Sequence, residues 1–436
     1  MFSLNLVWIL CVIFISPGTS LSEKLFGRAF AVIWNAPSEV CERHHGIKFN
    51  FDHYNIIQNT GDHFQGDKMV IFYEKQLGLY PFISPNGTHV NGGIPQLHNL
   101  KEHLKQTKLD VEKVIPSKNF KGPAVIDWEN WRPLYERNFG DKRIYKKLAI
   151  ADVQKQHPSW NVAEVNFDAE IQFDEAARKL MSSTLELGEK LRSDGRWGFY
   201  GFPRIYQKIP EQTRIANDRL GWLFSLSSAL YPSIYLHSKN DTWLKHFHFV
   251  VNTLNETFRI YDKFSFKNKT FVVPYVRFRY EHPEVLFTKA ELLLSMTIPA
   301  ATGSAGVIIW DSSFSYRNRE HCKTLKNYVT TTLGPFIKKL TETFQYCSEH
   351  LCNGNGRCVK SWGTIGDSTY WRNSKGEFNT FEDLKLNEFD RRELKTLLNI
   401  VNNATESHLL KREIKDMFTC KCYTKWTGKH CDNRRP

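Results

Sequence analysis

The segment from residue 124 to residue 133 reads Ala124-Val125-Ile126-Asp127-Trp128-Glu129-Asn130-Trp131-Arg132-Pro133. A run of buried-strand character leads into two carboxylates that are two positions apart. In a strand, residues i and i+2 point to the same side, so Asp127 and Glu129 face one space while Trp128 faces the other. Two acids in one desolvated site cannot both ionise freely, so we expect one pKa to rise. Acid-assisted glycosidic cleavage requires a proton donor beside a charged stabiliser. The alternative interpretation is that the two acids mark a solvated strand end without a catalytic role.

Strands and helices are predicted to alternate on both sides of this segment. Short apolar or β-branched runs predict strands at 29–35, 69–74, 123–129, 197–202, 232–237, 271–278 and 305–311. Amphipathic stretches predict helices near 97–114, 142–157, 169–193, 213–231, 242–264, 288–301 and 322–341. This alternation favours an α/β fold with a parallel sheet closed into a distorted (β/α) TIM-like barrel, whose catalytic groups stand at the carboxyl ends of strands.

The charge balance points to a polyanionic partner. The 436 residues include 59 Lys+Arg and 46 Asp+Glu, a formal net charge of +13, and none of these charges falls in residues 1–20. The 41% of hydrophobic residues argues against disorder and against a multi-span membrane protein. Without a basic block or zinc-finger spacing, an extracellular polyanion is favoured over nucleic acid. The histidine pairs at 44–45 and 246/248 lack a metal-ligand pattern, so no metal or cofactor is expected.

The N-terminus is predicted to be a signal peptide. An apolar run from Leu4 to Ile15 is too short to span a bilayer comfortably, and small residues follow at Gly18 and Ser20. We expect residues 1–20 to be removed, which predicts a secreted protein without a membrane anchor. We also expect the protein to be a monomer. Candidate glycosylation sites are Asn86, Asn240, Asn255, Asn268 and Asn403.

Eight cysteines remain once Cys11 leaves with the signal peptide, and an even number in an exported chain predicts four disulfides. Six of them fall in a region poor in apolar residues, so we divide the chain into a catalytic body at 21–344 and a small module at 345–436. The spacing Cys347-x4-Cys352-x5-Cys358 … Cys420-x-Cys422-x8-Cys431 resembles an epidermal-growth-factor-like (EGF-like) module with a long insertion at about 359–419. That resemblance implies the pairs Cys347–Cys358, Cys352–Cys420 and Cys422–Cys431. A bridge between the remaining Cys41 and Cys322 would tie the start of the body to its last helix.

The segment at 124–133 closely resembles the active-site strand of the hyaluronidase glycosidases. Further segments match that family in its own order, at 197–203, 229–236, 273–275, 305–310 and 332–336. The likeness runs from about residue 30 to residue 431, with epidermal-growth-factor-like spacing at its end.

The resemblance implies a role for each matched residue. Glu129 corresponds to the general acid/base, and Asp127 to the carboxylate that positions the acetamido group of the substrate. In this family the acetamido oxygen attacks the anomeric carbon, so the reaction is substrate-assisted and retaining. The remaining implied substrate contacts are Tyr200 and Tyr235 on the reacting sugar, Trp310 as its floor, Tyr275 and Glu281 as a polar pair lining the groove, and Arg132 as a partner for glucuronate.

Each of these contacts has a purely structural alternative. Trp310 ends an apolar run and would otherwise be assigned to the core, Tyr235 to a buried strand and Tyr200 to aromatic packing. Arg132 has Glu136 four residues on as an ion-pair partner, and Trp128 with Trp131 is expected to pack rather than to stack on substrate.

One departure from the family's pattern lies after Gly-Phe-Pro at 201–203. Vertebrate members usually carry an acidic residue and a cysteine there, whereas Arg204 stands here and places a positive charge near the cleft. The hypothesis is therefore a secreted endo-β-N-acetylhexosaminidase that cleaves β-1,4 N-acetylglucosaminide bonds in hyaluronan. The alternatives are a non-catalytic hyaluronan-binding or adhesion protein and a hydrolase that prefers chondroitin.

Overall fold

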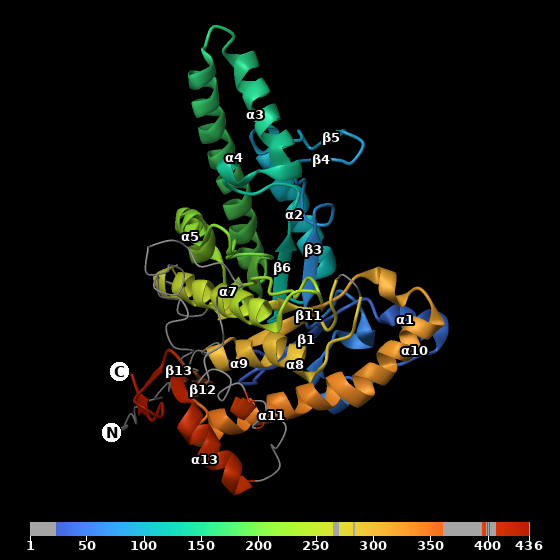
Figure 1. The fold of residues 1–436 in the computed structure, drawn as a ribbon. Coiled ribbons are helices and arrows are strands. Elements are labelled where there is room, and N and C mark those ends of the chain that lie inside the picture. The colour runs from blue at the N-terminus through green and yellow to red at the C-terminus, as the bar shows by residue number, and fades with distance from the viewer. Residues whose placement is uncertain are drawn as a thin grey trace, which may run out of the picture.

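The computed structural model describes residues 23–264, 270–281, 284–360, 395–397, 399, 401 and 407–435. The predicted signal peptide at 1–20, Asn268, Asn403 and most of the predicted insertion lie outside these residues. A barrel forms the body, and a helical hairpin projects from it (Figure 1). Of the described helices, none is both long and apolar enough to cross a membrane.

Among the described residues, nine short parallel strands form the barrel. They are β1 (Ala31–Asn35), β2 (Ile56–Ile57), β3 (Val70–Tyr73), β6 (Pro123–Asp127), β7 (Arg196–Phe199), β8 (Ala229–Leu230), β9 (Phe271–Val272), β10 (Tyr275–Val276) and β11 (Gly306–Trp310). β1 lies between β11 and β2, and β6 lies between β3 and β7. β8 pairs with β9, and single bridges at Tyr200–Tyr231 and Ser233–Tyr275 continue the wall. The α/β barrel prediction is confirmed.

The side chain of Asn59 joins β2 to β3 in the wall of the barrel. Asn59, which is 1% exposed, accepts hydrogen bonds from the backbone N–H groups of Lys68 and Met69, both at 2.9 Å. Its Nδ2 donates to the carbonyl oxygens of His63 at 2.9 Å and Met69 at 3.1 Å. At this seam between β2 and β3, the Asn59 amide thus makes the hydrogen bonds that a backbone ladder would make between two paired strands. This replacement of strand pairing by a side chain is one source of the barrel's distortion.

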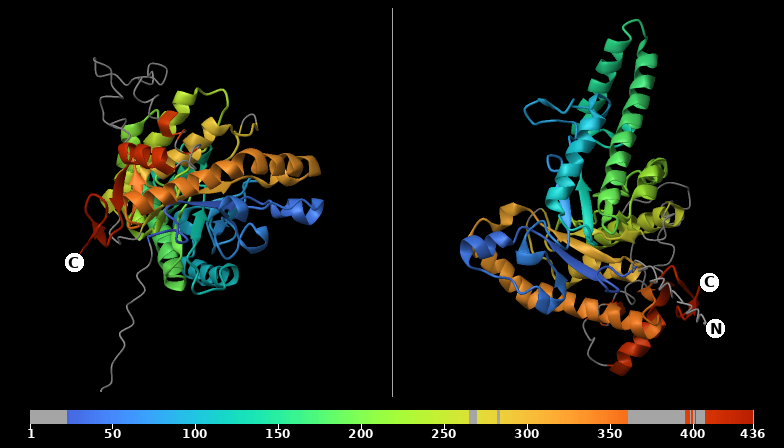
Figure 2. Two further views of the ribbon diagram at one scale, coloured as in Figure 1. Left: turned by 90° about the horizontal axis from the view of Figure 1, so that it is seen from below. Right: turned by 180° about the vertical axis from the view of Figure 1, so that it is seen from behind.

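Helices cover the outside of the barrel. They are α1 (Glu39–His45), α2 (Leu100–Val114), α3 (Arg143–Gln156), α4 (Val162–Leu191), α5 (Pro210–Arg219), α6 (Gly221–Leu226), α7 (Trp243–Phe264), α8 (Lys289–Leu292), α9 (Ile298–Thr302), α10 (Arg319–Tyr328) and α11 (Gly334–Leu351). α3 and α4 form the projecting hairpin, and the view from behind shows the two helices side by side (Figure 2, right). An Asn161–Glu164 capping box begins α4 by satisfying backbone N–H groups of its first turn.

Side chains alternate between two apolar layers, as the two-residue period of a strand requires. Ile33, Ile71, Val125 and Ile308 are at most 1% exposed and fill the interior of the barrel. Their chain neighbours point outward to the cores under the helices. Because Val125 points inward, the next residue of the same parity, Asp127, also points inward.

Two predicted elements near residue 230 are wrong. The helix predicted at 213–231 ends at Leu226, where α6 stops, and the strand lies at Ala229–Leu230 instead of 232–237. The hydroxyl of Ser227 donates to the carbonyl of Leu223, and that of Ser228 donates to the carbonyl of Gly195. The backbone N–H of Ser228 also donates to the carbonyl of Trp197, so the chain leaves the helix here to pair with β7.

The strand predicted at 271–278 is divided into β9 and β10. Pro274 stands between the two, and its ring nitrogen has no N–H to give to a ladder. β2, which the pattern analysis did not predict, is only two residues long.

Three disulfides are the pairs that the resemblance implied, Cys347–Cys358, Cys352–Cys420 and Cys422–Cys431, and the fourth is the expected bridge between the remaining Cys41 and Cys322. α11 crosses the predicted boundary at residue 344 and carries Cys347. The described part of the tail that follows contains α13 (Ser407–Met417) and two antiparallel strand pairs, β12 (Gly356–Val359) with β13 (Thr419–Cys422) and β14 (Trp426–Thr427) with β15 (Asn433–Arg434). Arg357 donates to the carbonyl of Ala29 just before β1, so the tail packs at the amino end of the barrel.

Candidate active site

The two predicted catalytic carboxylates stand at the carboxyl end of β6. Asp127 is its last residue and is 9% exposed, whereas the side chain of Glu129, beyond the strand, is 55% exposed. Both line one open pocket of about 620 Å3 at the mouth of the barrel. Seven of the eight predicted site residues meet there: Asp127, Glu129, Tyr200, Tyr235, Tyr275, Glu281 and Trp310.

The environment of Asp127 disfavours its charged form. Burial first, and then the charges of Glu129 and Glu74, raise the pKa of the Asp127 carboxyl to about 8, against the lowering effect of Arg204. Oδ1 of Asp127 is buried and has no hydrogen-bond partner among the described residues. A buried acceptor without a partner is suited to a donor that a ligand brings, such as an amide N–H.

Aromatic rings form the wall of the pocket. The rings of Tyr200 and Tyr275 meet edge-on with centroids 5.0 Å apart, and Tyr235 stacks on Trp310 at 6.1 Å. The hydroxyl of Tyr200 donates to Ser233 Oγ at 3.2 Å, and the buried Tyr275 hydroxyl has no partner among the described residues. Trp310 therefore lies at the pocket and not in the core, and stacked rings of this kind suit the apolar face of a sugar.

Glu281 lies at the rim. Its carboxylate is 3.3 Å from His237 Nδ1 and 3.9 Å from Arg277 Nη1. Behind Trp310, the buried carboxylate of Asp311 accepts hydrogen bonds from the guanidinium groups of Arg277 and Arg279. This ion cluster fixes the chain that carries the floor of the pocket.

Arg132 lies in a second pocket, of about 590 Å3, on the other side of Glu129. Its guanidinium donates to the carbonyl of Arg137 at 2.7 Å and covers the ring of Phe139 at 4.4 Å. The alternative partner Glu136 instead pairs with Arg219 at 3.1 Å. Arg132 is thus held beside the site, and its role toward substrate stays a prediction.

The expected packing of Trp128 and Trp131 is confirmed. Both indoles are buried and stack on the ring of Tyr80, with centroids 4.7 Å and 5.2 Å away. They support the turn after β6, and both also line the second pocket beside Arg132.

Sequence reasoning missed two residues at the carboxyl end of β3, its last residue Tyr73 and the following Glu74. The Tyr73 hydroxyl accepts a hydrogen bond from Trp310 Nε1 at 3.0 Å, and Glu74 Oε1 accepts one from Asn130 Nδ2 at 3.0 Å. Their position at the carboxyl end of a strand next to β6 was the available signal. Among the described residues there is no cluster of three or more metal-ligating side chains.

Comparisons with known proteins agree with this geometry. The family model described as hyaluronidase, of glycoside hydrolase family 56, matches residues 21–435. The chain belongs to the hyaluronidase family and is a glycoside hydrolase.

Individual relatives cover most of the chain. Hyaluronidase-1 of Sus scrofa is 37% identical over 425 residues, which is 95% of this chain and 94% of the relative. Hyaluronidase-1 of Homo sapiens is 41% identical over 343 residues, covering 76% and 79%. The crystal structure of bee venom hyaluronidase in complex with a hyaluronic acid tetramer matches with a TM-score of 0.67 and 31% identity. That match covers 71% of this chain and 99% of the bee chain.

Proposed function

We propose that this enzyme hydrolyses β-1,4 N-acetylglucosaminide bonds within hyaluronan and retains the configuration at the anomeric carbon. The observation that carries the proposal is the unequal environment of the two carboxyl groups. Asp127 is buried with an unpartnered oxygen inside the pocket, whereas Glu129 is exposed where two pockets meet. The solved complex of the bee venom relative with a hyaluronic acid tetramer supports the choice of polymer.

Glu129 acts first as an acid. Its carboxyl proton passes to the oxygen of the scissile bond as that bond breaks, and the acetamido oxygen of the same sugar attacks the anomeric carbon. The product is a cyclic oxazolinium-like intermediate and a released chain end. Glu129, now a carboxylate, takes a proton from the water that opens the ring, which restores both the acid and the acetamido group.

Asp127 holds the acetamido group for this attack. Its unpartnered Oδ1 accepts the N–H of that group, and Tyr200 and Tyr235 line the same pocket as further hydrogen-bonding side chains. Accepting the N–H favours the ionised form, so substrate binding lowers the pKa of Asp127 from its raised value in the empty pocket. The carboxylate then stabilises the positive charge of the intermediate.

The position of Glu129 between two pockets supports cleavage inside a chain. Sugars on both sides of the bond have room, with Trp310 as the floor on one side and Arg132 as a basic contact on the other. Cleavage inside the chain follows because the polymer can occupy both pockets, so neither pocket has to bind a chain end.

Export from the cell belongs to the same proposal. Four disulfides are typical of proteins from oxidising compartments, and the cysteine-rich tail is proposed to be an EGF-like module. Asn86 and Asn240 are exposed and suited to glycosylation, whereas Asn255 is half-buried on α7. We expect a monomer.

The test is depolymerisation of hyaluronan by the purified protein between about pH 3.5 and 7.5, with mass analysis of the product ends. Even-numbered saturated products with N-acetylglucosamine at the reducing end are expected. Unsaturated ends would indicate a lyase, and binding without cleavage would indicate an adhesion protein. Faster cleavage of chondroitin at matched chain length would make that polymer the preferred substrate.

A further inference from the structure

The two sides of Glu129 differ in charge. The pocket on the Asp127 side carries the acids Asp127 and Glu281 as well as Glu129. The pocket on the other side is lined by four cationic side chains, Arg132, Arg137, Lys142 and Arg204, with Glu129 as its acid. A carboxylate-bearing sugar is therefore favoured on the second side, which we call the basic half of the groove.

Two of these cations are already bonded to backbone oxygens. Arg132 donates to the carbonyl of Arg137, and Lys142 Nζ donates to the carbonyls of Glu129 and Asn130. These contacts hold the turn after β6 and leave less capacity for a ligand.

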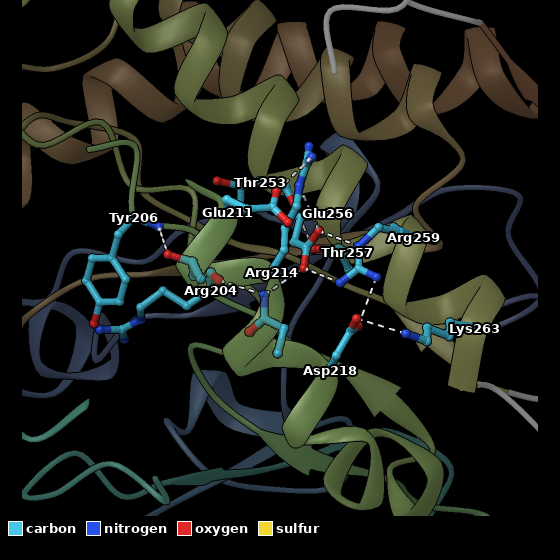
Figure 3. A network of polar contacts seen from close by, with 12 residues as sticks. Arg204, Tyr206, Glu211, Arg214, Asp218, Thr253, Glu256, Thr257, Arg259 and Lys263 are labelled. Carbon is cyan, nitrogen blue, oxygen red and sulfur yellow. Dashed lines mark hydrogen bonds and ion pairs between the residues drawn. The ribbon is translucent and has the colours of Figure 1, made fainter. Parts of the chain in front are cut away.

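Arg204 is placed differently. Its guanidinium lies 3.8 Å from Glu129 Oε1, a long contact for an ion pair, and 39% of its side chain is exposed. The Tyr206 hydroxyl is its other partner, and the two side chains lie next to each other (Figure 3). A guanidinium has five N–H donors, so these two contacts leave capacity for a planar carboxylate. Arg204 also lines a third pocket of about 800 Å3, so it faces the groove on two sides.

The backbone of Arg204 is anchored from behind. Its carbonyl accepts a hydrogen bond from Asn217 Nδ2 at 2.9 Å, and the same nitrogen donates to Glu256 Oε1 at 2.7 Å. Glu256, 2% exposed on α7, also accepts hydrogen bonds from Arg259 and lies 3.7 Å from Arg214 Nε (Figure 3). This buried network connects the loop after β7 to α5 and α7, so the guanidinium projects from a fixed base.

Gly201 leaves room for the guanidinium. It has φ +78°, and a Cβ at this position would lie 2.8 Å from Arg204 Nη2. The loop is therefore shaped to accept the arginine side chain against its backbone.

We propose that Arg204 determines specificity by binding the carboxylate of the uronic acid on the leaving-group side of the scissile bond. The inference rests on the proposed function. If N-acetylglucosamine occupies the Asp127 side, the alternation of sugars in hyaluronan puts glucuronate across Glu129, in the basic half. When Glu129 carries the proton that it donates, its charge no longer competes for the guanidinium, and the carboxylate of the substrate takes its place.

The experiment compares native hyaluronan with carboxyl-reduced hyaluronan, in which glucose replaces glucuronate, at matched chain length and ionic strength. The variants are Arg204→Gln, Arg204→Lys and, as a matched loss of one charge, Lys323→Gln on α10, which lines none of these pockets. Arg204→Gln should lower kcat/KM on native hyaluronan by about 10- to 100-fold, mainly through KM, and by less than about threefold on the reduced polymer. Arg204→Lys should keep part of the preference, and Lys323→Gln all of it.

Equal losses on both polymers would overturn the assignment and leave Arg204 as a support for Glu129. If Arg204→Gln melts below the assay temperature, Arg204→Lys decides in its place, because a ligand to the carboxylate must change the ratio between the two polymers. Wild-type protein inactive on both polymers would contradict the proposed function itself, an outcome distinct from active protein with an unchanged ratio.

Discussion

The indole N–H of Trp310 donates a 3.0 Å hydrogen bond to the hydroxyl of Tyr73, which joins the carboxyl ends of β11 and β3 across the mouth of the barrel. The ring of Tyr73 in turn stacks on Phe64. β3 thus orients Trp310, the floor of the pocket, although Trp310 itself belongs to β11.

Replacing Tyr73 with Phe should therefore loosen Trp310 without emptying the pocket. We expect KM for hyaluronan to rise about three- to tenfold, the effect of one neutral hydrogen bond, with a smaller change in kcat. Tyr54→Phe is the control, because its hydroxyl donates to the Thr330 carbonyl and lies in none of the described pockets. Equal effects of the two variants would refute the orienting role.

Glu129→Gln should abolish turnover while the protein still binds hyaluronan. Loss of a well-placed general acid lowers rates by about 10²- to 10⁴-fold, and the exposed side chain makes little contribution to folding. The measurements are kcat by reducing-end release and binding by ultracentrifugation with labelled oligosaccharide. A variant that keeps more than a few per cent of the wild-type rate would exclude Glu129 as the acid.

Asp127→Asn should change how stability depends on pH. Because the folded state raises the pKa of Asp127 from 3.8 to about 8, the folded protein binds a proton that the unfolded chain has lost between these values. Stability from this group is complete below pH 3.8 and falls with rising pH, by at most about 1.4 kcal/mol per pH unit, until about pH 8.

Urea unfolding at several pH values tests whether the stability contributed by Asp127 falls as the pH rises. The free energy of unfolding of Asp127→Asn minus that of wild type should increase from about pH 4 to pH 8. A constant difference would show that the folded protein does not raise this pKa. Activity of the variant should fall, since an amide does not stabilise the positive charge of the intermediate.

Asn59→Ala should open the seam of the barrel. The substitution removes the partner of the buried Met69 N–H, and of backbone groups of Lys68 and His63 that are only partly buried, at about 1–3 kcal/mol for a group that is left buried and unsatisfied. We expect a loss of at least about 2 kcal/mol in the free energy of unfolding. Asn166→Ala, an exposed residue of α4 whose amide donates one hydrogen bond to the Val162 carbonyl, is the comparison, and an equal loss there would argue against a special role for the seam.

The strand β6 and the pair of acids at its carboxyl end were predictable because their information is local. Alternation of side chains places Asp127 and Glu129 in one space, and an apolar run identifies the buried strand before them. The cysteine spacing likewise implied three of the disulfides through the resemblance to known modules, and the fourth joins the two cysteines that remained.

The rest depends on contacts between distant segments. β2 has two residues and is held by its neighbour β1, so no local period marks it. The hydrogen bond from Trp310 to Tyr73 spans 237 positions, and the partner of Glu136 proved to be Arg219 on α5 instead of Arg132. Such pairs follow from how the barrel closes, which short patterns do not specify.

The bridge between Cys41 and Cys322 encloses 281 positions of sequence, from α1 to α10. Nearly all of the barrel is therefore a covalent ring. A protease that cuts one exposed loop inside this ring produces two polypeptides that remain a single molecule, and the cut ends stay at high local concentration within the folded barrel. In a protease-rich fluid, a first cut would appear as two bands on a reducing gel, while the disulfide would still hold Asp127 and Trp310 in one molecule.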